Sequence, residues 1–174
     1  MAGSLEKISE TISTGSQSSL IVTGINSTYD VYVVQYYVRP VDNDKDLYVR
    51  VTTSGTGDSD SEYDMATLFM RADTSFGTTP VTNGTQWFFN SAMPNDSNKF
   101  SNATLYLFNF NNSSEFSFVT VESAGWNNSI DDLVGEQGGG VHTVAEANDG
   151  IELLWESGSN FASGSKVILY GLKK

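Results

Sequence analysis

Cysteine is absent from this chain of 174 residues, and proline occurs only three times. The lack of cysteine excludes disulfides, thiolate metal sites and cysteine nucleophiles. Stability must therefore come from burial of apolar surface and from association with other chains. The hydrophobic fraction of 39% and the aromatic fraction of 12% are sufficient for a packed core.

Positive charge is also scarce, because the chain has 9 Lys and Arg residues but 21 Asp and Glu residues, which gives a net charge of −12. Proteins that bind phosphate backbones or anionic lipid surfaces depend on Lys and Arg. We therefore expect neither nucleic acid nor a membrane as a partner. The sequence shows no secretory signal and no apolar run of the roughly 20 residues that span a bilayer. These absences predict a protein that is synthesised in the cytoplasm.

What the chain does contain is a series of short runs rich in Val, Ile, Tyr, Phe and Thr, each bounded by Gly, Asn, Asp or Ser. This pattern is typical of strands and tight turns. The run at 103–110 is apolar at both alternating sets of positions, which predicts a central strand that is covered on both faces. The residues at 111–114 predict a hairpin loop after it. The expected strands are 18–23, 30–39, 47–53, 62–71, 85–90, 103–110, 115–123, 141–145, 151–156 and 166–172.

These runs predict an all-β fold, a jelly-roll-like β-sandwich of about 8–10 short antiparallel strands. We expect one β-sandwich domain at 18–174 and an N-terminal arm at 1–17. Within the arm, residues 5–12 predict a minor helix with Ser4 as its N-cap. The turn-rich stretches at 74–84 and 135–140 are expected to be loops, the second being the more flexible because of three consecutive glycines.

The residues that carry catalytic chemistry are few or unpaired. His142 is the single histidine, and no Gly-x-Ser-x-Gly nucleophile elbow is present to accompany it. Carboxylates are abundant, but nothing in the sequence pairs two of them across a sugar as glycoside hydrolysis requires. We predict no catalytic residue, no cofactor and no enzymatic activity.

Two acidic stretches resemble parts of calcium-binding loops. Asp42, Asp44 and Asp46 place oxygens at alternate positions, as at the start of an EF-hand loop. The rest of that pattern fails, because Leu47 stands where the loop needs glycine and Thr53 where it needs a bidentate glutamate. The stretch at 58–62 alternates carboxylates in the same way. Each is a weak candidate for Ca²⁺, and the alternative is a charged turn that protects a strand edge.

Three consecutive aromatic residues, Trp87, Phe88 and Phe89, follow a turn-rich stretch. Side chains alternate between the faces of a strand, so the three rings cannot all point the same way. One interpretation places at least one ring against a neighbouring subunit or a sugar. The other is a strand that is covered on both faces.

The C-terminal residues 161–173 follow the pattern Phe-x-x-Gly-Ser-x-x-x-Leu-Tyr-Gly-Leu-Lys. This segment resembles the terminal strand of small all-β virion proteins, of the decoration and fibre type, from marine tailed bacteriophages. Residues 25–32 resemble the opening strand of that family, and Gly125 with Trp126 matches a weaker landmark. Together these positions extend over nearly the whole chain.

The resemblance implies a structural protein of the virion surface, made in the cytoplasm of the host. Its first implied role is a capsid decoration protein that binds the major capsid protein or other virion proteins, as a homotrimer. The arm at 1–17 would then grip the shell or a neighbouring copy. The alternative role is a tail-fibre or spike module that binds host surface glycans.

Overall fold

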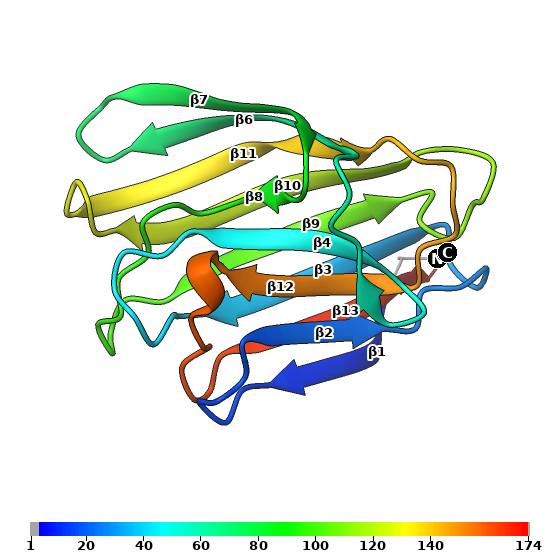
Figure 1. Ribbon diagram of the computed structural model, residues 1–174, viewed down its shortest axis with the longest axis horizontal. Coiled ribbons are helices and arrows are strands. Elements are labelled where there is room, and N and C mark those ends of the chain that lie inside the picture. Colours follow the sequence, from blue (N-terminus) through cyan, green and yellow to red (C-terminus); the bar gives the residue numbers. More distant parts are fainter. Residues whose placement is uncertain (1–3, 174) are drawn as a thin grey trace.

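The computed structural model describes residues 4–173 and shows two antiparallel β-sheets packed face to face as a sandwich (Figure 1). The larger sheet has eight strands in the order β1-β13-β3-β9-β10-β11-β6-β7, and the smaller has the order β2-β12-β4-β5 with β8 paired to β4. The elements are β1 Ser4–Ile12, β2 Ser19–Thr23, β3 Val31–Val38, β4 Leu47–Thr53, β5 Thr56–Gly57, β6 Tyr63–Arg71, β7 Phe76–Gly84, β8 Trp87–Phe88, β9 Ser101–Phe108, β10 Ser117–Asn127, β11 Asp132–His142, β12 Gly150–Trp155, the 3₁₀ turn η1 Glu156–Gly158 and β13 Lys166–Lys173. The predicted all-β sandwich is therefore confirmed.

The core lies between the two sheets and follows from the alternation of apolar side chains along the strands. In β9 the alternate residues Ala103, Leu105 and Leu107 are buried, and in β4 Leu47, Val49 and Val51 are completely inaccessible. Burial of apolar surface at about 25 cal/mol per Å² is the main term that holds such a sandwich together. Large aromatic side chains fill the space between the sheets: Tyr63, Trp87, Phe89, Phe110, Trp155 and Phe161.

The helix predicted at 5–12 is wrong, because these residues form the edge strand β1. Its backbone pairs antiparallel with the C-terminal strand β13, from Ser4 opposite Lys173 to Ile12 opposite Lys166, with a bulge near Ile8. Weak local helix preference is overridden by a partner strand that lies at the other end of the chain. Nine residues of the predicted arm thus belong to the large sheet, and the two ends of the chain lie close together (Figure 1).

The loops predicted at 74–84 and 135–140 are also strands. Residues 76–84 form β7, and the glycine-rich stretch lies within β11, between β10 and β6. Glycine weakens an isolated strand, but it is required where another group approaches closely. A Cβ on Gly139 would lie 2.7 Å from the Val119 carbonyl oxygen, and one on Gly140 would lie 2.5 Å from the indole nitrogen of Trp87. Glycine is therefore needed at these two positions because neighbouring groups pack closely against the backbone of β11.

Candidate functional site

The aromatic residues predicted as a binding surface belong largely to the core. Trp87 and Phe89 are completely inaccessible, and the Trp87 indole N–H faces the carbonyl oxygens of Asp64 and Val141 at 3.2 and 3.3 Å. Phe88 is half-buried and its ring contacts that of Tyr48 edge to face. The interface interpretation of Trp87 and Phe89 is therefore wrong, because both rings are closed off from any partner.

Of the three aspartates proposed as weak calcium ligands, Asp44 and Asp46 bind different partners. The Asp46 carboxylate accepts the backbone N–H of Ala92 at 2.8 Å, and burial raises the pKa of this group. The Asp44 carboxylate accepts the hydroxyl of Ser129, and Asp44 itself has a positive φ of 61°. Within residues 4–173, the triad at 42–46 is not among the groups whose ligand atoms converge on one point. Two of its carboxylates thus stabilise the turn after β3 and its contacts with neighbouring loops.

The surface with the strongest binding features is the outer face of the large sheet, on which side chains form rows across the strands. One row contains Phe108, Phe118, Val141 and Asp64, and the next contains Tyr170, Val33, Tyr106 and Thr120, of which Val33 is buried. We call these two rows the apolar half. Phe118 and Tyr106 are 45% and 41% exposed, respectively. Most of the exposed large hydrophobic side chains of the described residues lie on strands of this sheet: Leu5, Ile12, Tyr37, Leu68, Met70, Phe76, Tyr106, Phe118, Leu133 and Leu172.

A hollow lies within the apolar half. Gly139 has no side chain on this face, and the strands on either side of it carry Phe118 and Ala66. The resulting depression has a volume of about 560 Å³ and is also lined by Pro80 and Val141. A hollow beside an exposed aromatic ring is a feature of the central contacts in protein interfaces.

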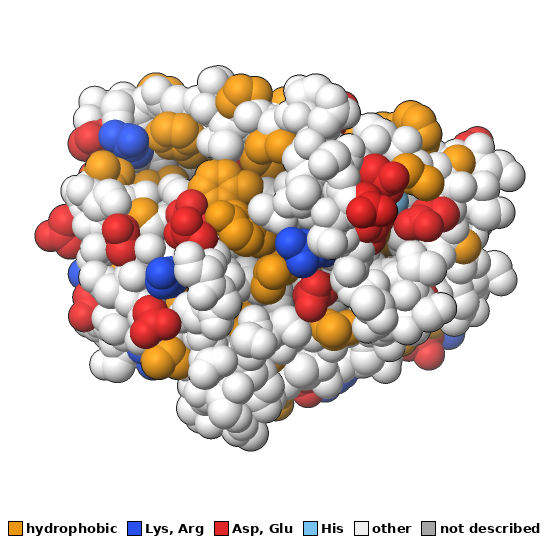
Figure 2. Space-filling model, viewed as in Figure 1, with side chains coloured by type: hydrophobic (Ala, Val, Ile, Leu, Met, Phe, Trp, Pro, Cys, Tyr) orange, Lys and Arg blue, Asp and Glu red, His pale blue; other side chains and the backbone are white. Residues whose placement is uncertain are grey.

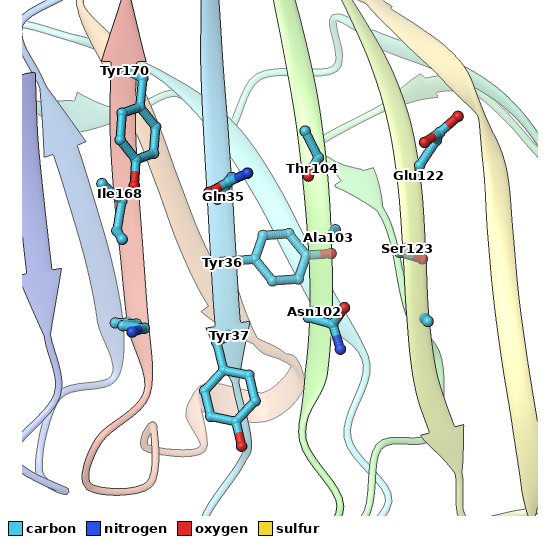
Figure 3. Close-up of a pocket in the computed structure, with 12 residues that line it drawn as sticks. Gln35, Tyr36, Tyr37, Asn102, Ala103, Thr104, Glu122, Ser123, Ile168 and Tyr170 are labelled. Atoms are coloured by element: carbon cyan, nitrogen blue, oxygen red, sulfur yellow. The ribbon is translucent and has the colours of Figure 1, made fainter. Parts of the chain in front are cut away.

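The adjoining rows form a polar groove of about 630 Å³ across β13, β3, β9 and β10 (Figure 3). We use the name polar groove for the surface lined by Gln35, Tyr37, Asn102, Thr104, Glu122, Lys166, Ile168 and Tyr170. The Tyr37 ring stacks on that of Phe100 at 4.2 Å with an angle of 4° between the rings. The Glu122 carboxylate accepts the amide of Gln137 at 3.2 Å. Rings, amides and one charge of each sign are therefore available to a polar ligand.

A buried polar network lies beneath the polar groove. The Tyr36 hydroxyl donates to the Asn90 side chain at 2.7 Å, and the Asn90 backbone N–H donates to the Glu136 carboxylate at 3.0 Å. Thr67 also donates its hydroxyl to Glu136. Burial raises the pKa of the Glu136 carboxyl, and burial likewise raises the pKa of Tyr36. This network holds β3, β6 and β11 together below the surface.

Sequence reasoning did not find the apolar half or the polar groove on the outer face of the large sheet. Its residues come from strands that are far apart in the chain, and no motif groups them. The available signal was the second face of each strand: in β3 the outward positions include Val33, Gln35 and Tyr37. Register between strands is needed before those positions become neighbours.

No protein-family model matches the sequence, and no curated protein matches it. Among solved structures, galectin LEC-6 of Caenorhabditis elegans is similar over 95% of this chain and 96% of that chain, with 12% sequence identity and a TM-score of 0.35. Within the described residues, no helix is long and apolar enough to cross a membrane.

Proposed function

We propose that this protein is a non-enzymatic structural protein of a bacteriophage virion surface, and that it decorates the outside of the capsid as a homotrimer. The observation that carries the proposal is the apolar half of the outer sheet face. Exposed apolar patches of this kind mark sites of protein association. The resemblance of the C-terminal strand to virion proteins supplies the class of partner, which is the major capsid protein or another virion protein.

The charge of the chain fits an external position. A net charge of −12 opposes contact with packaged nucleic acid, because binding to phosphates depends on positive side chains. Association that buries the apolar half would stabilise both the shell and the bound protein by mass action. The edge strand β1, with Leu5 and Ile12 exposed at 47% and 54%, extends the same outer face to its edge.

The first test is the amount and position of the protein on particles. Purified virions should contain it at a copy number comparable with that of the major capsid protein, and electron microscopy should place it outside the shell. A handful of copies per particle, or a position inside the head, would contradict the proposal.

A second test uses matched surface variants in a reconstitution with particles that lack the protein. Phe118→Ser and Tyr106→Ser remove exposed rings from the apolar half, and Val41→Ser alters a loop residue that is 43% exposed and lies off the sheets. Residues in the centre of an interface contribute about 2 kcal/mol or more, so we expect at least a roughly tenfold loss of particle binding for the two ring variants. The Val41 variant should bind normally. Equal binding by all three would refute the assembly surface.

The polar groove favours a second function, the binding of host surface glycans as part of a tail fibre or spike. The specific observation is the combination of Tyr37 and Tyr170 with amide, carboxylate and ammonium groups on four adjacent strands. Aromatic rings and a few polar groups that fix orientation are common in small-molecule sites. Labelled protein should then adhere to host cells, and Tyr37→Ala should abolish adhesion while Val41→Ser should not. Absence of adhesion to host cells and to a glycan array would rule this function out.

A further inference from the structure

His142 and the acidic stretch at 58–62 come together at one end of the sandwich, although Asp58 precedes His142 by 84 positions in the sequence. His142 ends β11 and pairs with Tyr63, the first residue of β6. The imidazole Nε2 lies 3.1 Å from Asp58 Oδ2 and 3.3 Å from Glu62 Oε2. Ligand atoms of the three residues all lie within 4.8 Å of one another. Figure 2, in which histidine is pale blue, shows acidic side chains gathered around it.

The two carboxylates converge on a single nitrogen atom, which carries at most one proton. That proton can form a strong hydrogen bond with one carboxylate, and the other then faces like charge. A divalent cation between the three groups would satisfy both carboxylates at once.

The second nitrogen of the imidazole gives independent support. The His142 side chain is completely inaccessible, and its Nδ1 is buried with no hydrogen-bond partner. The Oε1 atom of Glu146 lies 3.9 Å from this nitrogen. If Nε2 binds a metal ion, the ring proton must lie on Nδ1, where it faces this carboxylate. Metal-bound histidines usually have such a carboxylate or carbonyl partner on the other ring nitrogen.

Backbone contacts hold the three ligand residues in place. The Glu62 carbonyl oxygen accepts the backbone N–H of Thr143 at 2.8 Å and its hydroxyl at 3.0 Å. The Tyr63 hydroxyl donates to the Asp58 carbonyl oxygen at 3.0 Å. The stretch at 58–62 is therefore fixed beside His142 before any ligand binds.

We propose that Asp58, Glu62 and His142 form a binding site for a divalent transition-metal ion, with Zn²⁺ as the best match. Zn²⁺ is bound by imidazole nitrogen and carboxylate oxygen, and three protein ligands with one water is a common set. Ca²⁺ instead takes six to eight oxygen ligands. Asp58 and Glu62 have side chains that are 20% and 31% exposed, so an ion can reach them from solvent. This site goes beyond the function proposed above, and beyond the sequence, which marks the stretch at 58–62 only as a weak candidate for Ca²⁺ and gives His142 no part in a metal site.

The single histidine makes the test direct, because its ring resonances are unambiguous in a long-range ¹H–¹⁵N NMR spectrum. Protein purified with a chelator and then titrated with Zn²⁺ should show a shift of the Nε2 resonance and a rise in melting temperature. Asp58→Asn and Glu62→Gln should each weaken Zn²⁺ binding at least tenfold, and Glu146→Gln should weaken it roughly 10–100-fold as the loss of an outer partner. Asp58→Asn keeps an acceptor for the backbone N–H of Asp60, which the Asp58 carboxylate binds at 2.9 Å, so the turn should persist.

Asp60→Asn is the matched control, because Asp60 lies in the same stretch but outside the cluster. It should bind Zn²⁺ as the wild type does. If Zn²⁺ leaves the His142 resonances unchanged, or if the Asp58 and Glu62 variants bind as tightly as the wild type and the Asp60 variant, the site does not exist. Circular dichroism of each variant separates lost binding from lost folding.

Discussion

The substitution Gly140→Ala tests whether the glycines of β11 are required because neighbouring groups pack closely against this strand. Gly140 faces the core, and a Cβ there would lie 2.5 Å from Nε1 and 2.6 Å from Cδ1 of Trp87, and 3.0 Å from the Asp64 carbonyl oxygen. The indole cannot easily retreat. Its N–H faces two carbonyl oxygens, and its ring meets that of Tyr63 edge to face at 5.2 Å.

The expected cost has two parts. Inserting a methyl group into a well-packed core costs about 1–3 kcal/mol, and loss of the indole hydrogen bond adds about 0.5–1.5 kcal/mol. The unfolding free energy should therefore fall by about 1.5–4.5 kcal/mol. For a chain of this length that corresponds to a decrease in melting temperature of about 3–18 °C.

Gly135→Ala in the same strand is the control. A Cβ at Gly135 would meet its nearest neighbours, the Ser123 carbonyl oxygen and the Met70 side chain, at 3.6 and 3.8 Å, which are ordinary contacts. Where alanine fits, it stabilises by about 0.4–1 kcal/mol by restricting the unfolded chain. Urea denaturation of both variants measures the difference. A Gly140 variant as stable as the Gly135 variant would refute the packing argument and favour a mobile loop at 135–140.

Two further predictions concern carboxylates that accept hydrogen bonds, one on the buried Glu136 and one on the partly buried Asp149. Burial raises the pKa of Glu136 above its ordinary value of 4.5, so the folded protein holds this proton more tightly than the unfolded chain does. Its favourable contribution is complete below pH 4.5 and is lost as the pH rises through the folded pKa, so Glu136→Gln should gain stability relative to the wild type over that interval. Chemical denaturation at several pH values measures the difference, and a constant difference would contradict the assignment. Asp149 accepts the Thr52 hydroxyl at 2.6 Å and the Gly55 backbone N–H at 2.9 Å on its two oxygens, and asparagine can accept only one of them. Asp149→Asn should therefore lose about 1–3 kcal/mol in urea denaturation, and an unchanged midpoint would show that these contacts contribute nothing.

The sequence by itself determined the class of fold, because alternation and turn residues act locally. The run at 103–110 corresponds to the interior strand β9, the loop at 111–114 lies within the turn before β10, and the C-terminal run at 166–172 is β13. The prediction that both faces of this strand are covered is wrong. The outer face of β9 is open at Tyr106, which is 41% exposed.

Tertiary structure decided everything that depends on which strands are neighbours. Residues 5–12 became a strand because β13 offers a partner, and the glycines of β11 fit because a tryptophan and two strands approach them. The two halves of the outer face and the cluster of His142 with Asp58 and Glu62 arise in the same way. Their residues are distant in sequence, and only the register of the sheets brings their side chains together. Periodicity specifies the faces of a single strand, whereas neighbouring positions on different strands are fixed by the pairing of the whole chain.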